Sequence, residues 1–410
     1  MNARETALVL LNEIEEKDSY ANLSLKKGLN KADANEKALA TELVYGVIRY
    51  KMTLDFIRRK FSKIREEKIS LSVKNILRLG IYQIFYTEKI PVSAACNESV
   101  KLAHKYSNKG AASFVNGVLR NISRNKDNFS FPEGIKEKLM YKYSFPEDIT
   151  NIVIRDYGES AEQIFSNLNS QKCACIRPNL LKITSEEFEK SILKDRCVKD
   201  GTCYYVKSVS DYMEYIEKGL VFIQDRASMM CVETLLPAAG ENVLDLCAAP
   251  GGKSIYMAQL MGNDGKIVSC DLHSHRVELI KKNARRAGVT TITASLNDGT
   301  KVNPDFINKF DKILVDAPCS GFGVISGKPD IKWTKRNLTE LTCVQQKILE
   351  NALMYLNENG VLVYSTCTIN KDENERLVKR IKGIKVIEEK QLLPDDKHDG
   401  FYIAKVVKTH

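Results

Sequence analysis

The chain has 410 residues, of which 43% are hydrophobic and 28% charged, a composition typical of a soluble globular protein with two or three domains. No apolar run approaches the roughly 18 residues of a membrane helix, and the first residues lack the apolar core of a secretory signal. Eleven scattered cysteines fit a reducing cytoplasm, and neither they nor the five histidines have the spacing of a metal site. We therefore expect a cytoplasmic protein without a metal, and a monomer by default.

Positive charge gathers in the N-terminal part of the chain, which supplies most of the net charge of +10. Residues 1–150 hold 26 Lys and Arg against 18 Asp and Glu. A basic region of this kind suggests a polyanionic partner, most simply nucleic acid, with an ordinary solvated surface as the alternative. Five cations lie between apolar stripes and are available to phosphates under the first interpretation: Arg58, Arg59, Lys60, Lys63 and Arg65.

Residues 1–126 are predicted to form a compact bundle of amphipathic helices, with clear apolar stripes over 73–84 and 114–122. Proline and glycine breakers then indicate a linker over 127–148. Residues 149–227 begin with a helix and continue with short strand-like runs, which predicts a small α+β subdomain. Its runs are three strands at Cys175–Ile183, Cys203–Lys207 and Leu220–Gln224, and a helix at Ser185–Leu193.

Helices and strands alternate over residues 228–410, which predicts a parallel sheet with helices on both faces. In such sheets ligands bind beyond the carboxyl ends of the strands, so the residues there should carry the chemistry. The predicted strands are 242–247, 266–271, 291–296, 311–316 and 360–366.

The first of these strands runs into a glycine turn and then a helix. Glycine lets the backbone approach a ligand closely, and the start of a helix offers unpaired N–H groups. Taken alone, the turn could equally be a device for tight packing. Its residues are Cys247, Ala248, Ala249, Pro250, Gly251, Gly252 and Lys253.

Acidic residues end the next two strands. Asp271 follows the glycine turn at about the distance where nucleotide-binding folds place a carboxylate on a ribose diol, roughly 20 residues. Asp298 ends the third strand and suits the adenine side. The G-x-G-x-x-G run that seats a pyrophosphate is missing from the turn, so S-adenosylmethionine, which has no phosphate, is favoured over NAD.

Two cysteines follow the last two predicted strands, one in Asp316-Ala-Pro-Cys319 and one in Thr366-Cys367-Thr368. The strand-end rule places both thiols in the same crevice as the glycine turn. Asn370 with Glu373 predicts a helix start, whose positive end would lower the pKa of the Cys367 thiol. Two buried structural cysteines are the alternative.

A methyltransferase needs a thiol when its target is carbon 5 of a pyrimidine. Attack of a thiolate on carbon 6 breaks the aromaticity, so that carbon 5 can take the methyl group. A carboxylic acid at N3 would neutralise the charge that develops on the ring. The run Asp316-Ala-Pro-Cys319 also differs from the Asn/Asp-Pro-Pro-aromatic run of amine methylases. The spacing does not decide which thiol attacks.

Longer runs carry a resemblance to a known family. In the C-terminal domain they are Leu244–Ser254, Asp316–Gly321, Pro329–Trp333, Tyr364–Thr368, Asn374-Glu375 and Asp399–Phe401. These resemble the RNA 5-methylcytosine methyltransferases of the Sun (RsmB) type. Three N-terminal runs resemble the NusB-type RNA-binding helical domain: Tyr45–Arg49, Leu77–Gly80 and Asn116–Asn121.

The resemblance implies an all-α NusB-like bundle, the small α+β subdomain and an α/β Rossmann-like class I methyltransferase domain. It implies methylation, with S-adenosylmethionine, of carbon 5 of one cytidine in 16S ribosomal RNA, cytosine 967 in that family. It makes Cys367 the nucleophile, and it gives Cys319 a part in releasing the methylated base. Asp316 would reach both cofactor and base. The remaining cofactor positions are Asp271, Asp298 and the turn Cys247–Lys253.

Two rival functions remain open on the sequence. A tRNA cytosine-5 methyltransferase would use the same chemistry, although the NusB-like domain speaks against it. An RNA-binding assembly or antitermination factor with an inert methylase domain would need no intact site. For a methyltransferase acting on ribosomal RNA or on tRNA, the target cytidine should be unpaired, because flipping it out of a stack costs a few kcal/mol.

Overall fold

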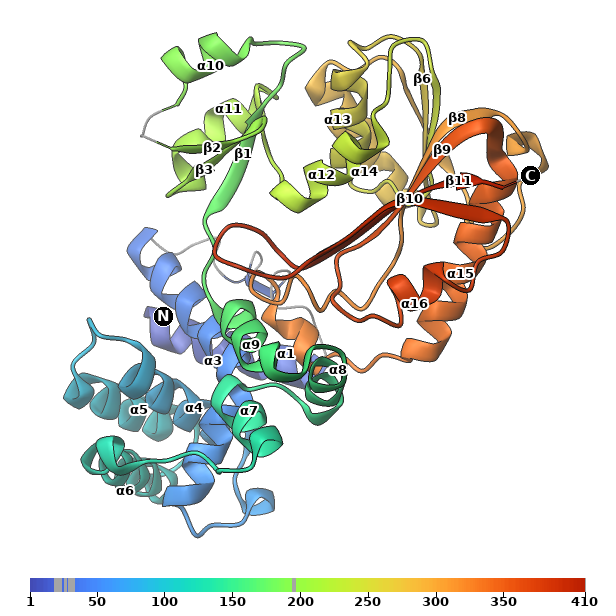
Figure 1. Ribbon diagram of the computed structural model, residues 1–410. Coiled ribbons are helices and arrows are strands. Elements are labelled where there is room, and N and C mark those ends of the chain that lie inside the picture. The colour runs from blue at the N-terminus through green and yellow to red at the C-terminus, as the bar shows by residue number, and fades with distance from the viewer. Residues whose placement is uncertain (18–23, 26–27, 29–33, 194–196, 410) are drawn as a thin grey trace. The chain divides into compact units, whose positions relative to one another are not determined.

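The computed structural model describes residues 1–17, 24–25, 28, 34–193 and 197–409 (Figure 1). The chain divides into two compact units. The helical unit comprises Met1–Asn169 with Lys328–Thr334, and the α/β unit comprises Ser170–Gly327 with Lys335–His410. None of the described helices is both long and apolar enough to cross a bilayer.

The helical unit confirms the predicted all-helical N-terminal third. Its centre is α4, which is buried along most of its length and carries the stripe over 73–84. Gly80 lets α6 approach closely, since a Cβ there would lie 2.6 Å from Leu119. The helices are α1 Ala3–Lys17, α3 Ala34–Phe61, α4 Leu71–Tyr86, α5 Val92–Tyr106, α6 Lys109–Arg124, α7 Ile135–Tyr143, α8 Glu147–Tyr157 and α9 Ala161–Asn169.

The stretch 127–148, expected as a linker, contains α7. Tyr141 of α7 stacks on Phe56 of α3, with ring centroids 4.4 Å apart, and Thr53 Oγ1 donates to the Tyr141 carbonyl at 2.6 Å. The compact helical unit therefore reaches Asn169 instead of ending at 126, because α7 packs on α3 and is followed without a break by α8 and α9.

One of the five cations expected to face phosphates is instead buried. Arg58 is 1% exposed and forms ion pairs with Glu66 and Asp55. A guanidinium in that position neutralises acidic side chains of its own unit and is unavailable to RNA, so the prediction was wrong for Arg58. The other four cations are exposed: Arg59, Lys60, Lys63 and Arg65.

The segment Lys328–Thr334, far along the chain, belongs to the helical unit. Within it a 3₁₀ turn over Pro329–Trp333 presents Lys332, which is 3% exposed. The ammonium group donates to the Arg49 carbonyl at 2.9 Å and to Asn169 Oδ1 at 2.7 Å. Burial, with the nearby Arg49 charge, lowers the pKa of Lys332 well below its usual range.

The α/β unit begins with a four-stranded antiparallel sheet in the order β2-β3-β1-β4. Each of the three predicted runs contains a strand and the predicted helix is present, but the first strand ends at Pro178 and not at 183. Strand β2 is an addition, short and largely exposed. The elements are β1 Ala174–Pro178, α10 Ser185–Ser191, β2 Val198–Asp200, β3 Cys203–Val206, α11 Met213–Glu217 and β4 Val221–Ile223.

A seven-stranded sheet in the order β10-β11-β9-β8-β5-β6-β7 forms the rest of the unit. All five predicted strands are present and pair in parallel. The bounds are α12 Arg226–Leu235, β5 Asn242–Asp245, α13 Gly252–Leu260, β6 Lys266–Asp271, α14 Ser274–Ala287, β7 Ile292–Leu296, β8 Phe310–Asp316, α15 Leu338–Tyr355, β9 Leu356–Thr366, α16 Glu375–Val378, β10 Ile384–Leu392 and β11 Phe401–Lys408.

The expectation of a purely parallel sheet was wrong at one edge, where β11 runs antiparallel to β9 and β10 antiparallel to β11. The edge strand β10 is mostly exposed and rich in Lys and Glu, so it lacks the apolar run of an internal strand. Helices cover both faces of the sheet. Val243 packs with α12–α14 on one face, and its neighbour Leu244 packs with α15 and α16 on the other.

Candidate active site

The glycine turn lies between β5 and α13, at the carboxyl edge of the sheet. Gly251 has φ +100°, a left-handed conformation that favours glycine, and it is the residue from which α13 starts. The Gly251 N–H donates to the Ala248 carbonyl at 2.7 Å, and the Ala248 N–H donates to the Cys270 carbonyl of β6 at 2.8 Å. The turn is thereby attached to the neighbouring strand.

Helix α14 holds the outer side of the turn. Arg276 donates to the Ala249 carbonyl at 3.3 Å, and Asn283 donates to the Pro250 carbonyl at 2.9 Å. Both carbonyls are engaged by α14, while the first N–H groups of α13 have no partner within their own helix. The turn can therefore present donors and small side chains to a ligand.

Asp245, at the end of β5, is a site residue that the sequence analysis did not select. It is 1% exposed, and its Oδ2 accepts a hydrogen bond from Ser254 at 2.6 Å. Its Oδ1 is buried and has no hydrogen-bond partner among the described residues. Burial raises the pKa of Asp245 to about 7. A buried acceptor without a partner beside the glycine turn fits a ligand that brings a donor or a positive charge.

We expect Asp245→Asn to change how stability depends on pH. Because folding raises the pKa from 3.8 to about 7, the folded state holds this proton more tightly. The stabilisation is complete below pH ~4 and is lost as the pH rises toward 7, a decline of up to about 4 kcal/mol. In urea denaturation without ligand, the variant should therefore gain stability relative to the natural protein between pH 5 and pH 7. If the free energies of unfolding of the two proteins run parallel between pH 5 and pH 7, then Asp245 is ionised across that range.

Cys247 follows the same strand and forms part of the wall of the turn. Burial, together with the Asp245 and Asp316 carboxylates, raises the pKa of this thiol well above its usual range. A thiol held neutral in this way is a poor nucleophile. Cys247 is therefore suited to lining a pocket and unsuited to attack.

Asp271 and Asp298 lie at the ends of neighbouring strands β6 and β7, and both are engaged locally. Asp271 is 3% exposed, accepts the His273 N–H at 3.1 Å and lies 3.3 Å from Arg276. Asp298 accepts both the N–H and the hydroxyl of Thr300, which lower its pKa. Among the described residues, neither carboxylate is in direct contact with the thiols of Cys319 and Cys367.

Two exposed leucines accompany these carboxylates and were also missed. Leu272 follows Asp271 and is 56% exposed, and Leu296 ends β7 and is 61% exposed. Apolar side chains of this size, exposed at the carboxyl edge of the sheet, can pack against a flat heterocycle. The available signal was their position beside the strand-end acids.

Lys253 and Asp316 connect the glycine turn to the loop after β8. The Lys253 ammonium lies 2.6 Å from Asp316 Oδ2, and Asp316 Oδ1 accepts the Ser365 hydroxyl at 3.0 Å. Burial would lower the pKa of Lys253, but the Asp316 carboxylate outweighs it and the pKa is raised. The pair is therefore a fixed positive and negative charge at the head of the loop that carries Cys319.

The two thiols predicted to share a crevice lie side by side. Cys319 Sγ and Cys367 Sγ are 3.3 Å apart although 48 residues separate them in the chain. Both side chains are half-buried. The hydrogen bond with Cys367, together with burial, raises the pKa of Cys319 well above its usual range. The arrangement holds Cys319 as a neutral thiol against Cys367.

The predicted helix start at Asn370 is wrong. The only helix in this stretch is α16, four residues long and starting at Glu375. Asn370 and Glu373 are instead fully buried, and the Asn370 amide donates to Glu373 Oε1 at 2.9 Å. Their side chains pair with each other inside the protein, and Asn370 Oδ1 accepts the Asp372 N–H at 3.2 Å in a turn that precedes α16. A helix dipole therefore does not activate Cys367.

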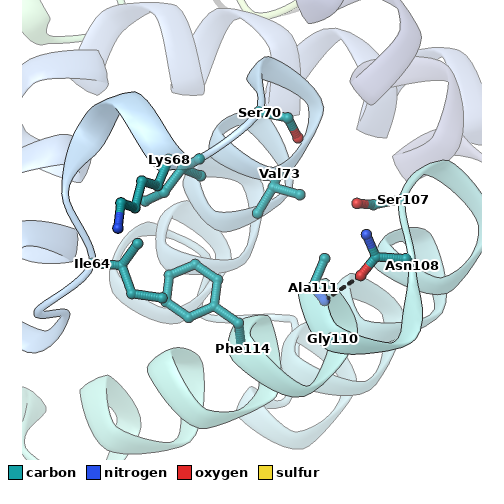
Figure 2. Close-up of a pocket in the computed structure, with 10 residues that line it drawn as sticks. Ile64, Lys68, Ser70, Val73, Ser107, Asn108, Gly110, Ala111 and Phe114 are labelled. Atoms are coloured by element: carbon teal, nitrogen blue, oxygen red, sulfur yellow. Dashed lines mark hydrogen bonds between the residues drawn. The ribbon is translucent and has the colours of Figure 1, made fainter.

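A separate pocket of about 340 Å³ lies in the helical unit, between the loop before α4 and the start of α6 (Figure 2). Lys68 is its one basic lining residue, and Phe114 and Ile64 supply apolar surface. Asn108 already accepts the Ala111 N–H at 2.9 Å as the cap of α6. The lining holds no thiol or carboxylate, so we assign the pocket no part in catalysis.

Comparison with known families accounts for both ends of the chain. The NusB family matches residues 1–124, and the family described as 16S rRNA methyltransferase RsmB/F matches residues 232–407. The probable ribosomal RNA small subunit methyltransferase B of Bacillus subtilis is 40% identical over 92% of this chain and 87% of its own length. This chain belongs to the methyltransferase B family.

Other relatives agree with this assignment. Ribosomal RNA small subunit methyltransferase B of Photorhabdus laumondii is 29% identical over 99% of both chains. The crystal structure of PH0851 shares the fold, with a TM-score of 0.80, 21% identity and coverage of 100% of this chain and 99% of its own. As a methyltransferase B, the protein is an RNA cytosine-5 methyltransferase dependent on S-adenosylmethionine, so the prediction of this cofactor over NAD is confirmed.

The residues around the turn fit that cofactor. Asp245 Oδ1 is the buried acceptor without a partner among the described residues. A Cβ at Gly252 would meet nothing nearer than Gln224 at 4.0 Å, so the start of α13 is uncrowded. The leucines beside Asp271 and Asp298 offer apolar surface. Asp271 and Asp298 would face the nucleoside, and the turn would face the amino-acid end.

Proposed function

We propose that this protein methylates carbon 5 of one unpaired cytidine in 16S ribosomal RNA, in the cytoplasm and as a monomer. The family resemblance points to cytosine 967 as that nucleotide. The observation that carries the proposal is the pair of thiols 3.3 Å apart next to the Lys253–Asp316 ion pair. Amine methylation needs no such pair, whereas carbon-5 methylation needs one thiol to attack and help for it to leave.

We assign the attack to Cys367, following the resemblance. Its sulfur, which has lost its proton to solvent, attacks as the thiolate and forms a bond to carbon 6 of the cytosine. The electron pair of the C5–C6 double bond then becomes available at carbon 5. S-adenosylmethionine, when bound, supplies the methyl group that carbon 5 takes. The carbon-5 proton then passes to solvent, the C5–C6 double bond re-forms, and the C6–S bond breaks to return the thiolate. Cys319, held as a neutral thiol, donates a hydrogen bond to the departing sulfur.

The Lys253–Asp316 pair serves the polar edge of the base. The carboxylate of Asp316 can accept a hydrogen bond from the exocyclic amino group of cytosine. The ammonium of Lys253 can offset the negative charge that develops on the ring. Preorganised charges of this kind stabilise a transition state without reorganising. Ser365 fixes the orientation of Asp316 through its hydroxyl. Uridine, with an oxygen in place of the amino group, would be a poorer partner for the carboxylate.

RNA affinity is assigned to the helical unit, which contains the predicted domain over residues 1–126, and to the small subdomain built on the sheet of β1–β4. The four exposed cations after Arg58 support this role, and so does the match of residues 1–124 to the NusB family. Binding through phosphates should weaken steeply with added salt.

Bisulfite mapping of ribosomal and transfer RNA tests the proposal, because 5-methylcytosine resists conversion. RNA from cells with the protein should retain one protected cytidine in 16S RNA that disappears when the gene is deleted and returns with a plasmid copy. The control is the same plasmid carrying Cys367→Ala. If deletion of the gene removes protection only in tRNA, the substrate is tRNA and not ribosomal RNA. If deletion changes neither map, the protein is an RNA-binding factor without methyltransferase activity.

A further inference from the structure

Glu373 is a fully buried carboxylate next to the thiols, with no role in the chemistry described above. Its Oε2 accepts the Ser320 N–H at 2.8 Å and the Gln345 amide at 2.9 Å, and its Oε1 accepts the Asn370 amide at 2.9 Å. No basic side chain of the described chain forms an ion pair with it. A buried charge without a counter-ion is costly, and these three hydrogen bonds offset part of that cost.

The three donors come from the segments that carry the thiols and from α15. Ser320 directly follows Cys319 on the loop after β8, and Asn370 lies three residues beyond Cys367 on the loop after β9. Gln345 belongs to α15. One carboxyl group therefore joins both thiol loops to a helix of the core.

Further contacts fix the same two loops. The Gln345 amide also donates to the Pro318 carbonyl at 2.9 Å. The Ser320 and Thr368 hydroxyls are hydrogen-bonded at 2.7 Å, and the Gly323 N–H donates to the Cys367 carbonyl at 3.0 Å. On one side of Cys319 the Ser320 N–H is bonded to Glu373 itself, and on the other side the Pro318 carbonyl is bonded to Gln345, which also contacts Glu373. These bonds fix the position of the Cys319 sulfur.

The charge of Glu373 acts in the same direction as the geometry. After the hydrogen bond with Cys367 and burial, the nearby carboxylates of Glu373 and Asp316 also raise the pKa of Cys319. A negative charge beside a thiol opposes its ionisation. A neutral Cys319 leaves the attack to Cys367, as assigned above.

We propose that Glu373 is a positioning residue that holds Cys319, protonated, against Cys367 and thereby speeds release of the methylated base. The proposal rests on the function assigned above. As the C6–S bond breaks, negative charge builds on the Cys367 sulfur, and a neutral thiol fixed 3.3 Å away can donate a hydrogen bond to it. A loosened or ionised Cys319 could not.

Two substitutions separate charge from position. Glu373→Gln removes the charge and faces one of the three donors with an amide N–H₂. Glu373→Asp keeps the charge but shortens the arm by one methylene group. Both should release the covalent RNA adduct roughly 10- to 100-fold more slowly, by analogy with the loss of one hydrogen bond to a buried charge. Adduct formation and S-adenosylmethionine binding should change by less than about threefold. Glu278→Gln, an exposed position on α14, is the matched control.

The second readout needs no RNA. In a Cys367→Ala background, alkylation of Cys319 by iodoacetamide is followed against pH by mass spectrometry. With Glu373→Gln added, the midpoint should move to lower pH, whereas Glu373→Asp should leave it near that of the parent. Unchanged midpoints together with natural release rates in both variants would overturn the proposal. If the natural protein formed no RNA adduct at all, the proposed function would fail, while the alkylation experiment would still decide whether Glu373 controls Cys319.

Discussion

Cys367→Ala is expected to abolish methyl transfer, by roughly 10⁴-fold or more, and to leave S-adenosylmethionine binding intact. Without the sulfur, carbon 6 takes no nucleophile and carbon 5 stays part of an aromatic ring. The proposed cofactor site lies at the turn after β5 and at the ends of β6 and β7, whereas Cys367 follows β9. Transfer of tritiated methyl to 16S RNA and calorimetric titration with the cofactor measure the two effects.

Cys343→Ala is the matched control, because Cys343 is an exposed cysteine on α15. It should methylate at the natural rate. Substantial turnover in Cys367→Ala would show that the other thiol attacks, or that the target is not carbon 5. A parallel loss of cofactor binding would instead point to a damaged fold.

Cys319→Ala is expected to accumulate a covalent protein–RNA complex. Attack by Cys367 and methyl transfer can proceed, but the departing sulfur loses the hydrogen bond of its neighbour at 3.3 Å. On a denaturing gel, labelled RNA should migrate with the protein, and the RNA bound in this way should carry the methyl group. Multiple turnover should nearly cease while one methyl per enzyme is still transferred.

The double variant Cys319→Ala/Cys367→Ala provides the control, since it should form no complex. If Cys319→Ala shows only free RNA and normal turnover, then solvent alone suffices for release. If a covalent protein–RNA complex still forms without Cys367, then Cys319 is the attacking thiol and Cys367 assists release. Glu373→Gln should resemble a milder form of Cys319→Ala, because it disturbs the position and protonation of the same sulfur.

Local signals predicted most of the α/β unit. A short apolar run followed by a glycine turn, or by an acid or a cysteine, is written in consecutive residues, and each of the five predicted strands is present. The edge strand β10 was missed because it is exposed and charged, so its pairing depends on β11 and not on its own pattern. Its neighbour β11 is a buried apolar run that the sequence analysis did not select. The exposure predicted for Arg58 was wrong because a run of cations does not reveal which of them will be buried against acidic side chains, here Asp55 and Glu66.

The amino-acid sequence by itself determined the order of the elements, the residues at the strand ends and, through its motifs, the family and its cofactor. These follow from periodicity and from residue types at short spacing, which act within a few residues of one another. The tertiary structure alone decided that two thiols 48 residues apart lie in contact, and that Asn370 and Glu373 form a buried pair in place of a helix start. Such partnerships depend on which polar groups are removed from water together, and only the packed fold specifies that.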